Sequence, residues 1–111
     1  LNSKKVFYKN PKFHPDGSCL DSNGNLYIAI YGEGKVNRVN KHGQIDMSIK
    51  LPAKNITCCS FGGENLDQLF ITSGIQTDDP KDPNDLGGAM FTVDMKKYGV
   101  HGLPKFKFKL N

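Results

Sequence analysis

The sequence predicts an all-β fold built from β-propeller blades. Short runs rich in β-branched and aromatic residues alternate with glycine-containing turns along most of the chain. A similar pattern returns 43 residues later, from Leu26 to Leu69, and each unit has room for about four strands. This period and strand number are typical of a propeller blade. The alternative is a small β-sandwich with accidental similarity between its halves.

The first unit contains a short mixed strand at residues 4–9 and then three better-defined strands. Residues 26–31 (LYIAIY) are apolar on both faces, which predicts a strand covered on both sides. Residues 35–40 (KVNRVN) follow, and residues 44–51 alternate apolar and polar side chains until Pro52 ends the run. Turns are predicted at Asp16 and Gly17, at Asn23 and Gly24, at residues 32–34 and at His42 and Gly43.

The second unit repeats this order. Strands are predicted at residues 56–61, 68–73, 89–94 and 105–110, with a turn at Gly62 and Gly63 and a long polar loop at residues 74–88. Leu69 corresponds to Leu26, and the following strands end in Val39 and Val93. Cys59 is aligned with Cys19 in this comparison. The lysines of the last strand, KFKFKL, would protect a sheet edge from pairing with other chains.

Composition narrows the classes of function. The chain has 111 residues, enough for one small domain, and a net charge of +4 with scattered lysines and a single arginine, Arg38. Nucleic-acid readers depend on arginine, so no nucleic-acid partner is expected. No apolar run approaches the length of a membrane-spanning helix, so no membrane partner is expected either.

The three cysteines, Cys19, Cys58 and Cys59, are expected to be reduced thiols. A bridge between adjacent Cys58 and Cys59 would be strained, whereas Cys19 could reach either of them. Adjacent cysteines do not have the spacing of a structural zinc site, and both are expected to pack in the interior. Free thiols and the absence of a signal pattern predict a cytoplasmic protein.

Four stretches together resemble one known family. They are "PDG" at residues 15–17, "LDSNGNLYIAIYGEGKVNRVN" at 20–40, "IKLPAKNITCCSFGGENLDQLFITSG" at 49–74 and "GGAMFTVD" at 87–94. The chain resembles the last third of the regucalcin/gluconolactonase, or senescence-marker-protein, family, over roughly Pro15 to Phe108. Glu33 departs from the family's usual small or amide residue in its turn.

The resemblance implies a six-bladed β-propeller, of which residues 1–111 are the C-terminal portion and supply about the last two blades. It implies one divalent metal, whether calcium, zinc, manganese or magnesium, and hydrolysis of a sugar lactone to the aldonic acid. Of the family's metal ligands only the aspartate of "PDG" falls in this chain, so Asp16 is the candidate metal ligand and catalytic residue. The rest of the propeller chain would supply the others.

Plainer interpretations stay open beside this one. By composition alone, Asp16 is a turn residue, Asp21 is another, and the aspartates of the 74–88 loop are solvated. Two blades cannot close a ring, and the chain begins with Leu1, so a truncated chain or an assembly of copies is expected. The alternatives to the lactonase are a non-catalytic calcium-binding or regulatory propeller and an inactive truncated relic.

Overall fold

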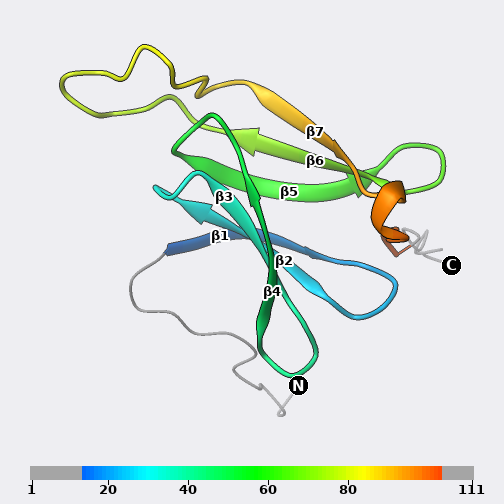
Figure 1. The fold of residues 1–111 in the computed structure, drawn as a ribbon. Helices are drawn as coiled ribbons and strands as arrows, with labels where there is room; N and C mark the ends of the chain where they lie inside the picture. Colours follow the sequence, from blue (N-terminus) through cyan, green and yellow to red (C-terminus); the bar gives the residue numbers. More distant parts are fainter. Residues whose placement is uncertain (1–13, 104–111) are drawn as a thin grey trace, which may run out of the picture.

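The computed structural model describes residues 14–103, which form two antiparallel sheets packed against each other (Figure 1). The first sheet contains β1 (His14–Leu20), β2 (Leu26–Tyr31), β3 (Lys35–Val39) and β4 (Ile45–Lys50). The second contains β5 (Ile56–Gly62), β6 (Gln68–Ser73) and β7 (Met90–Asp94), followed by the short 3₁₀-helix η1 (Lys96–Tyr98). Each strand pairs with the next in sequence, so both sheets are simple meanders.

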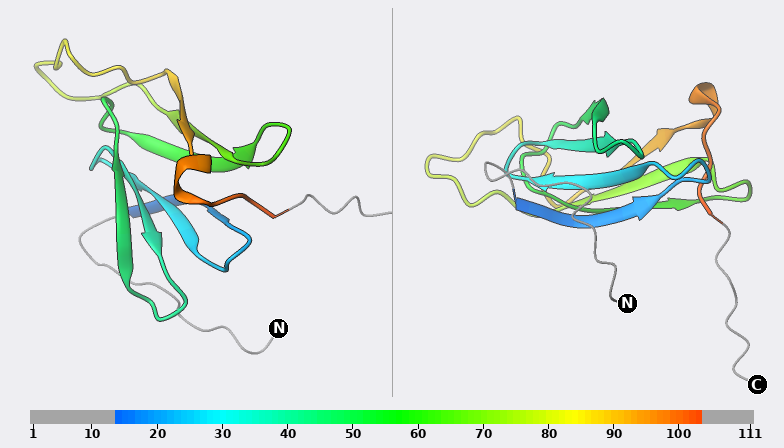
Figure 2. Two further views of the ribbon diagram at one scale, coloured as in Figure 1. Left: turned by 45° about the vertical axis from the view of Figure 1, so that its right-hand side comes forward. Right: turned by 90° about the horizontal axis from the view of Figure 1, so that it is seen from below.

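The predicted strands lie where the patterns placed them, within a residue at each end. The 74–88 segment is a loop, as predicted, and extends beyond the sheets in both further views (Figure 2). Strand β1 and the 3₁₀-helix were not predicted. The strands expected at residues 4–9 and 105–110 lie outside the described residues. No helix within residues 14–103 is long and apolar enough to cross a membrane.

Strand β2 is one of the two inner strands of the first sheet and is covered on both faces. Tyr27 and Ala29 point toward the second sheet and belong to the main hydrophobic core, whereas Ile28 and Ile30 belong to a smaller cluster on the opposite face. All four are buried. The continuous apolar run at residues 26–31 is therefore explained by burial on both faces of the strand, as the sequence predicted.

The two sheets meet through the first sheet's forward face, which we define as the face carrying Tyr27, and the second sheet's rear face, which carries Phe61. The Tyr27 and Phe61 rings make an edge-to-face contact, with centroids 5.2 Å apart and planes at 86°. Leu69 and Ile71 from β6 complete the same core and are fully buried. This interface supplies most of the apolar burial in the described part of the chain.

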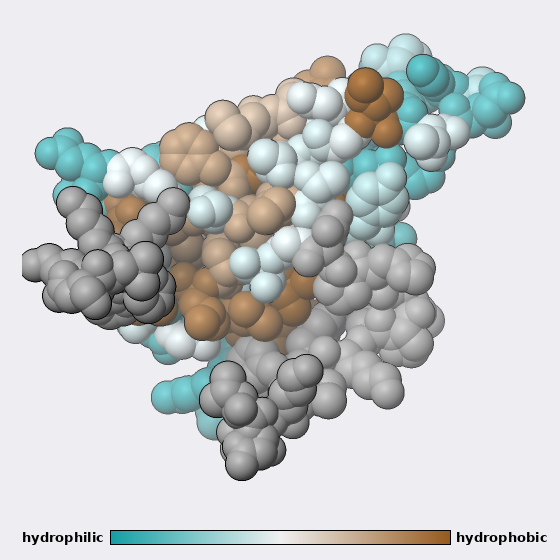
Figure 3. All heavy atoms as spheres, turned by 180° about the vertical axis from the view of Figure 1, so that it is seen from behind, coloured by the Kyte–Doolittle hydropathy of each residue, from teal (hydrophilic) through white to brown (hydrophobic). Residues whose placement is uncertain are grey.

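The other two faces retain exposed apolar side chains. On the rear face of the first sheet, Leu20 is 46% exposed and Ile45 is 44% exposed. On the forward face of the second sheet, Met90 is 61% exposed. Figure 3 shows apolar surface between polar margins on the back of the molecule. Such exposure on a sheet is typical of a surface that packs on a further element.

The register of the ladders tests the predicted repeat directly. Leu26 pairs with Val39, and Leu69 pairs with Val93, which confirms the 43-residue step in these strands. The alignment of Cys19 with Cys59 was wrong. Ser18, which pairs with Ile28, is the counterpart of Cys59, which pairs with Ile71. Cys19 lies on the opposite face of its sheet, toward the core between the sheets.

Candidate metal centre

Asp16, the candidate ligand, lies inside β1 and not in a turn before it, so the predicted turn at Asp16 and Gly17 was wrong. Pro15 pairs with Ile30 and Ser18 with Ile28, so two residues of β1 face one residue of β2. This arrangement is a β-bulge, in which an extra residue bends the strand and redirects its side chains. The turn-forming pair therefore bends a strand without reversing the chain.

Gly17 explains why the bulge fits its surroundings. A Cβ atom at this position would lie 2.4 Å from Cys58 Sγ and 2.8 Å from Cys58 Cα. Strands β1 and β5 thus approach so closely at the bulge that only glycine can occupy the place next to Asp16. The glycine at position 17 is therefore required by packing between the two sheets as well as by the backbone shape of the bulge.

The end of the sheets that carries the bulge also carries the long loop. Tyr31, which faces His14 across the first sheet, forms a bridge with Asn55, and Asn55 O accepts a hydrogen bond from Gly74 N at 2.7 Å. Asn55 is buried, and its Nδ2 donates to Ile75 O at 3.3 Å. The loop is therefore attached to the same edge of the molecule as the start of β1.

The acidic residues of this loop organise the loop itself. Asp85 accepts hydrogen bonds from Lys54 N at 2.9 Å and Gly87 N at 2.7 Å. Asp78 pairs with Lys54 Nζ at 3.0 Å, an exposed ion pair that raises the lysine pKa chiefly through the hydrogen bond. The Asp82 carboxylate accepts a hydrogen bond from Asn84 N at 2.9 Å, and the Asp82 backbone C=O and N–H exchange two hydrogen bonds with the buried Gln76 side chain, at 2.6 and 3.0 Å. The aspartates thus act as loop supports, not as the ligand ladder of a calcium loop.

A divalent metal requires more ligands than this part of the chain provides. Calcium takes six to eight oxygen ligands. Among the side chains that the structure describes, those of residues 17–103, no group of three or more His, Cys, Asp or Glu is placed to hold a metal ion. These side chains therefore do not by themselves complete a metal site, and the Asp16 side chain lies outside the side chains that the structure describes.

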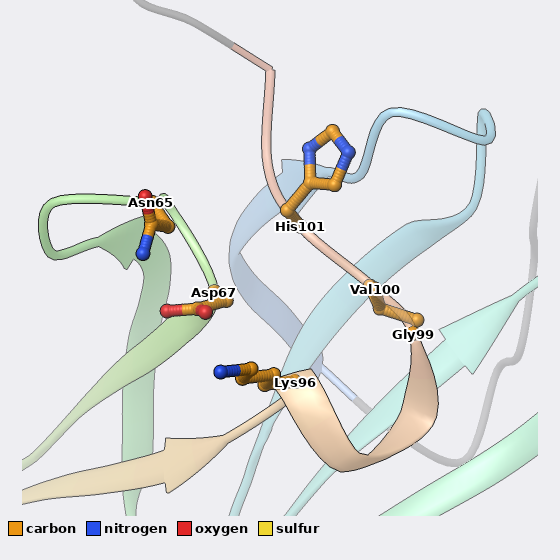
Figure 4. A pocket seen from close by; sticks show the side chains of 6 residues that line it. All are labelled: Asn65, Asp67, Lys96, Gly99, Val100 and His101. Atoms are coloured by element: carbon orange, nitrogen blue, oxygen red, sulfur yellow. The ribbon is translucent and has the colours of Figure 1, made fainter.

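A pocket of about 320 Å³ lies at the opposite end of the sheets (Figure 4). It is lined by Asn65, Asp67, Lys96, Gly99, Val100 and His101. This end is held by the bridge between Asp21 and Gly102 and by the hydrogen bond from Gly102 N to Leu66 O at 2.7 Å. The pocket is thus separate from the bulge of β1.

Asp21 has a larger structural role than that of the turn residue predicted from the sequence. Its carboxylate is buried and accepts hydrogen bonds from Asn23 N (2.9 Å), Asn25 N (2.9 Å), Asn25 Nδ2 (3.0 Å) and the Tyr27 hydroxyl (2.9 Å). Burial, with Asp21 as hydrogen-bond acceptor, raises the pKa of Tyr27. The turn signal at Asn23 and Gly24 predicted the hairpin. Nothing in that signal predicted that the Tyr27 hydroxyl would donate a hydrogen bond to the Asp21 carboxylate.

Arg38 connects this network to the next strand. Its Nη1 donates to the Tyr27 hydroxyl at 3.5 Å, and its Nε donates to Asp46 at 2.7 Å. The hydrogen bond to Asp46 raises the pKa of the guanidinium, which stays positively charged. The only arginine of the sequence is therefore a cross-strand support of the first sheet.

Comparison with known proteins identifies a family and relatives that agree with one another. A family model described as the SMP-30/gluconolactonase/LRE-like region matches residues 1–75. The chain is 33% identical to regucalcin of Danio rerio over 97% of its length, and 32% identical to a putative sugar lactone lactonase of Bacillus subtilis over 81%. It spans only 38% and 32% of those proteins.

Two solved structures share the fold. Regucalcin from Agrobacterium tumefaciens, described as a calcium-binding protein, superposes with a TM-score of 0.77 at 29% identity, covering 92% of this chain and 35% of that one. A luciferin-regenerating enzyme superposes with a TM-score of 0.69 at 31% identity, covering 80% and 30%. Both are propellers, which confirms the predicted fold class for this part of the chain. The chain belongs to the SMP-30/gluconolactonase/LRE-like family.

Proposed function

We propose that the complete protein hydrolyses a sugar lactone to its aldonic acid with the help of a divalent metal. In this proposal residues 1–111 are the C-terminal portion of a six-bladed propeller and supply about its last two blades. The observation that carries the proposal is the family match, together with a relative named as a putative sugar lactone lactonase. The rest of the propeller chain and the lactone are the expected partners.

The position of Asp16 supports a role for this residue. Bulges are frequent beside active sites, where they redirect a side chain, and Asp16 stands in one. We propose Asp16 as one oxygen ligand of the metal, with the remaining ligands supplied by parts of the protein that this chain does not span. Calcium, zinc, manganese and magnesium are the candidates, and an oxygen ligand suits calcium and magnesium best.

The proposed chemistry is addition of water to the lactone carbonyl. When bound, the metal would polarise that carbonyl and lower the pKa of a water molecule. The Asp16 carboxylate is suited to accept a proton from the attacking water. The ring C–O bond then breaks, the former ring oxygen takes up a proton, and the free acid leaves.

The mass of the native protein should be measured first. We expect a product several times heavier than the 12.3 kDa of this chain. A native product of 12.3 kDa would contradict a single-chain lactonase and leave self-assembly of copies or a relic.

The complete protein should then be assayed with gluconolactone and each metal. Asp16→Asn is expected to lower kcat/KM by about 100-fold or more. Asp67→Asn, at the opposite end of the sheets, is the matched control and should retain activity. Equal activity of wild type and Asp16→Asn would reject the role of Asp16.

The second candidate is a calcium-binding propeller without catalysis, which the naming of the Agrobacterium relative as calcium-binding favours. Calorimetric titration with calcium distinguishes the two candidates. Calcium binding that depends on Asp16, without lactone hydrolysis under any metal, would establish this second function. The absence of both would indicate a relic. We propose a cytoplasmic location, which the three free cysteines support.

A further inference from the structure

Two cysteines from different sheets face each other in the core between the sheets. Cys19 Sγ, from β1, donates a hydrogen bond to Cys59 Sγ, from β5, at 3.7 Å. The two residues are 40 positions apart in sequence. Cys59 is 2% exposed, whereas Cys19 is half-buried and so more accessible to small molecules.

The third cysteine provides an internal contrast. Cys58 is adjacent to Cys59 but is exposed, because neighbouring residues of a strand point to opposite faces. The expectation that both would pack in the interior was therefore wrong for Cys58. Its Sγ contacts the carbonyl of Cys59 at 3.7 Å and makes no contact with Cys19 Sγ among the hydrogen bonds of the described residues.

We propose that Cys19 and Cys59 are a redox modification site, at which a peroxide joins the two sheets by a disulfide bond. A disulfide requires its sulfur atoms about 2.05 Å apart. Side-chain rotation can bring two thiols together from 3.7 Å because they already face one another. The bond would tie β1, the strand with the Asp16 bulge, to β5.

The reaction balances with one peroxide molecule. The Cys19 thiolate attacks one peroxide oxygen, the O–O bond breaks, and Cys19 becomes a sulfenic acid while hydroxide leaves. Cys59 sulfur then attacks the Cys19 sulfur, the S–O bond breaks, and the second oxygen leaves as water. Two thiols lose two electrons and two protons, and hydrogen peroxide is reduced to two water molecules.

Burial of Cys59 indicates which thiol reacts first. Its hydrogen bond with Cys19 and its burial raise the pKa of the Cys59 thiol. Because the thiolate is the reactive form, Cys59 is suited to be the second partner. Disulfides in cytoplasmic proteins are usually transient and respond to oxidants, which agrees with a reversible bond here.

The test uses the 111-residue chain with Cys58→Ser, so that the two facing cysteines are the only thiols. The folded protein is treated with hydrogen peroxide, alkylated with iodoacetamide and digested with trypsin. We expect a monomeric product without free thiols, in which the peptide containing Cys19 is joined to the peptide containing Cys59. Recovery of Cys19 as sulfinic acid with Cys59 still alkylated would overturn the proposal, as would disulfides only between separate chains.

A second measurement covers the case in which a variant folds poorly. Oxidation of the wild-type chain should raise Tm by on the order of 10 °C, because the bond closes a loop of about 40 residues, and dithiothreitol should reverse the rise. Cys19→Ser should show no rise, whereas Cys58→Ser should behave as wild type. An equal rise in Cys19→Ser would assign the effect to another pair. Neither result depends on lactonase activity.

Discussion

The two sheets follow the same blade pattern but are supported in different ways. In the first sheet, Tyr27 pairs with Arg38, and both belong to a polar network that begins at buried Asp21. At the corresponding place in the second sheet, Phe70 pairs with Thr92, and neither side chain carries a charge. The network is therefore not a requirement of the blade, since one sheet forms without it.

The bulged strands differ in the same way. The first sheet has Asp16 and Gly17 at its bulge, and the second has its register shift between Ile56 and Cys58, at the corresponding point. Thr57 stands in that second bulge, with its hydroxyl 2.7 Å from that of Thr72. One backbone irregularity thus carries a carboxylate in one sheet and a neutral hydroxyl in the other. This contrast favours a specific use for Asp16, because the backbone shape does not demand an acid.

The largest expected effect comes from removing the buried carboxylate of the first sheet. Asp21→Ala should lower the free energy of unfolding by about 2–4 kcal/mol, because it leaves the Tyr27 hydroxyl and two backbone N–H groups without their acceptor. Urea unfolding measures the change.

The matched control lies in the hairpin of the second sheet. The Asp67 carboxylate accepts a long hydrogen bond, at 3.5 Å from Gln68 Nε2, and the bond from Met95 N goes to the Asp67 backbone carbonyl, which alanine keeps. Asp67→Ala should therefore change stability by no more than about 0.5 kcal/mol. Equal losses in the two variants would show that the hairpins are supported alike.

A smaller loss is expected where the two bulged strands touch. Gly17→Ala should destabilise the protein by about 1–3 kcal/mol, because its Cβ would overlap the backbone and side chain of Cys58. Thermal unfolding followed by circular dichroism is the measurement. The control Cys58→Ala alters an exposed side chain and should cost less than about 1 kcal/mol. If Gly17→Ala were as stable as wild type, the close approach of β1 and β5 would be disproved.

The smallest effect concerns pH. The folded state raises the pKa of Tyr27, so below about pH 10 the phenol is protonated in both folded and unfolded chains and its contribution is constant. Above that pH the unfolded chain loses the proton while the folded chain keeps it, so stability should fall by up to about 1.4 kcal/mol per pH unit.

Tyr27→Phe removes this alkaline loss, and it should also cost about 1 kcal/mol at neutral pH through the lost hydrogen bond to Asp21. Urea unfolding between pH 9 and pH 11 tests both. Tyr98→Phe, at an exposed side chain, should keep the alkaline slope of wild type. A wild-type slope in Tyr27→Phe would assign the alkaline loss to other groups.

Much of the fold could be predicted because it is encoded locally. The apolar run at β2 indicated a strand with two covered faces, and Leu26 and Leu69 indicated the repeat that the ladders confirm. The errors arose where one local signal has two structural outcomes. Asp16 and Gly17 are a turn-forming pair that here forms a bulge, and Cys19 and Cys59 shared a residue type without sharing a face.

The candidate site was less predictable. The resemblance to a family singled out Asp16, whereas no periodicity distinguishes that aspartate from Asp21 in the next turn. The network of Asp21, Tyr27, Arg38 and Asp46 joins three strands, and its members are up to 25 positions apart.

The sequence by itself determined strands β2 to β7, the turns between most of them and the family, because each depends on neighbouring residues or on motifs of fixed spacing. Only the tertiary structure decided that Gly17 must lack a side chain, that Asp21 is buried and that Cys19 meets Cys59. These features depend on how the two sheets pack against each other. The spacing of residues along one strand does not predict which atoms of the other sheet they will meet.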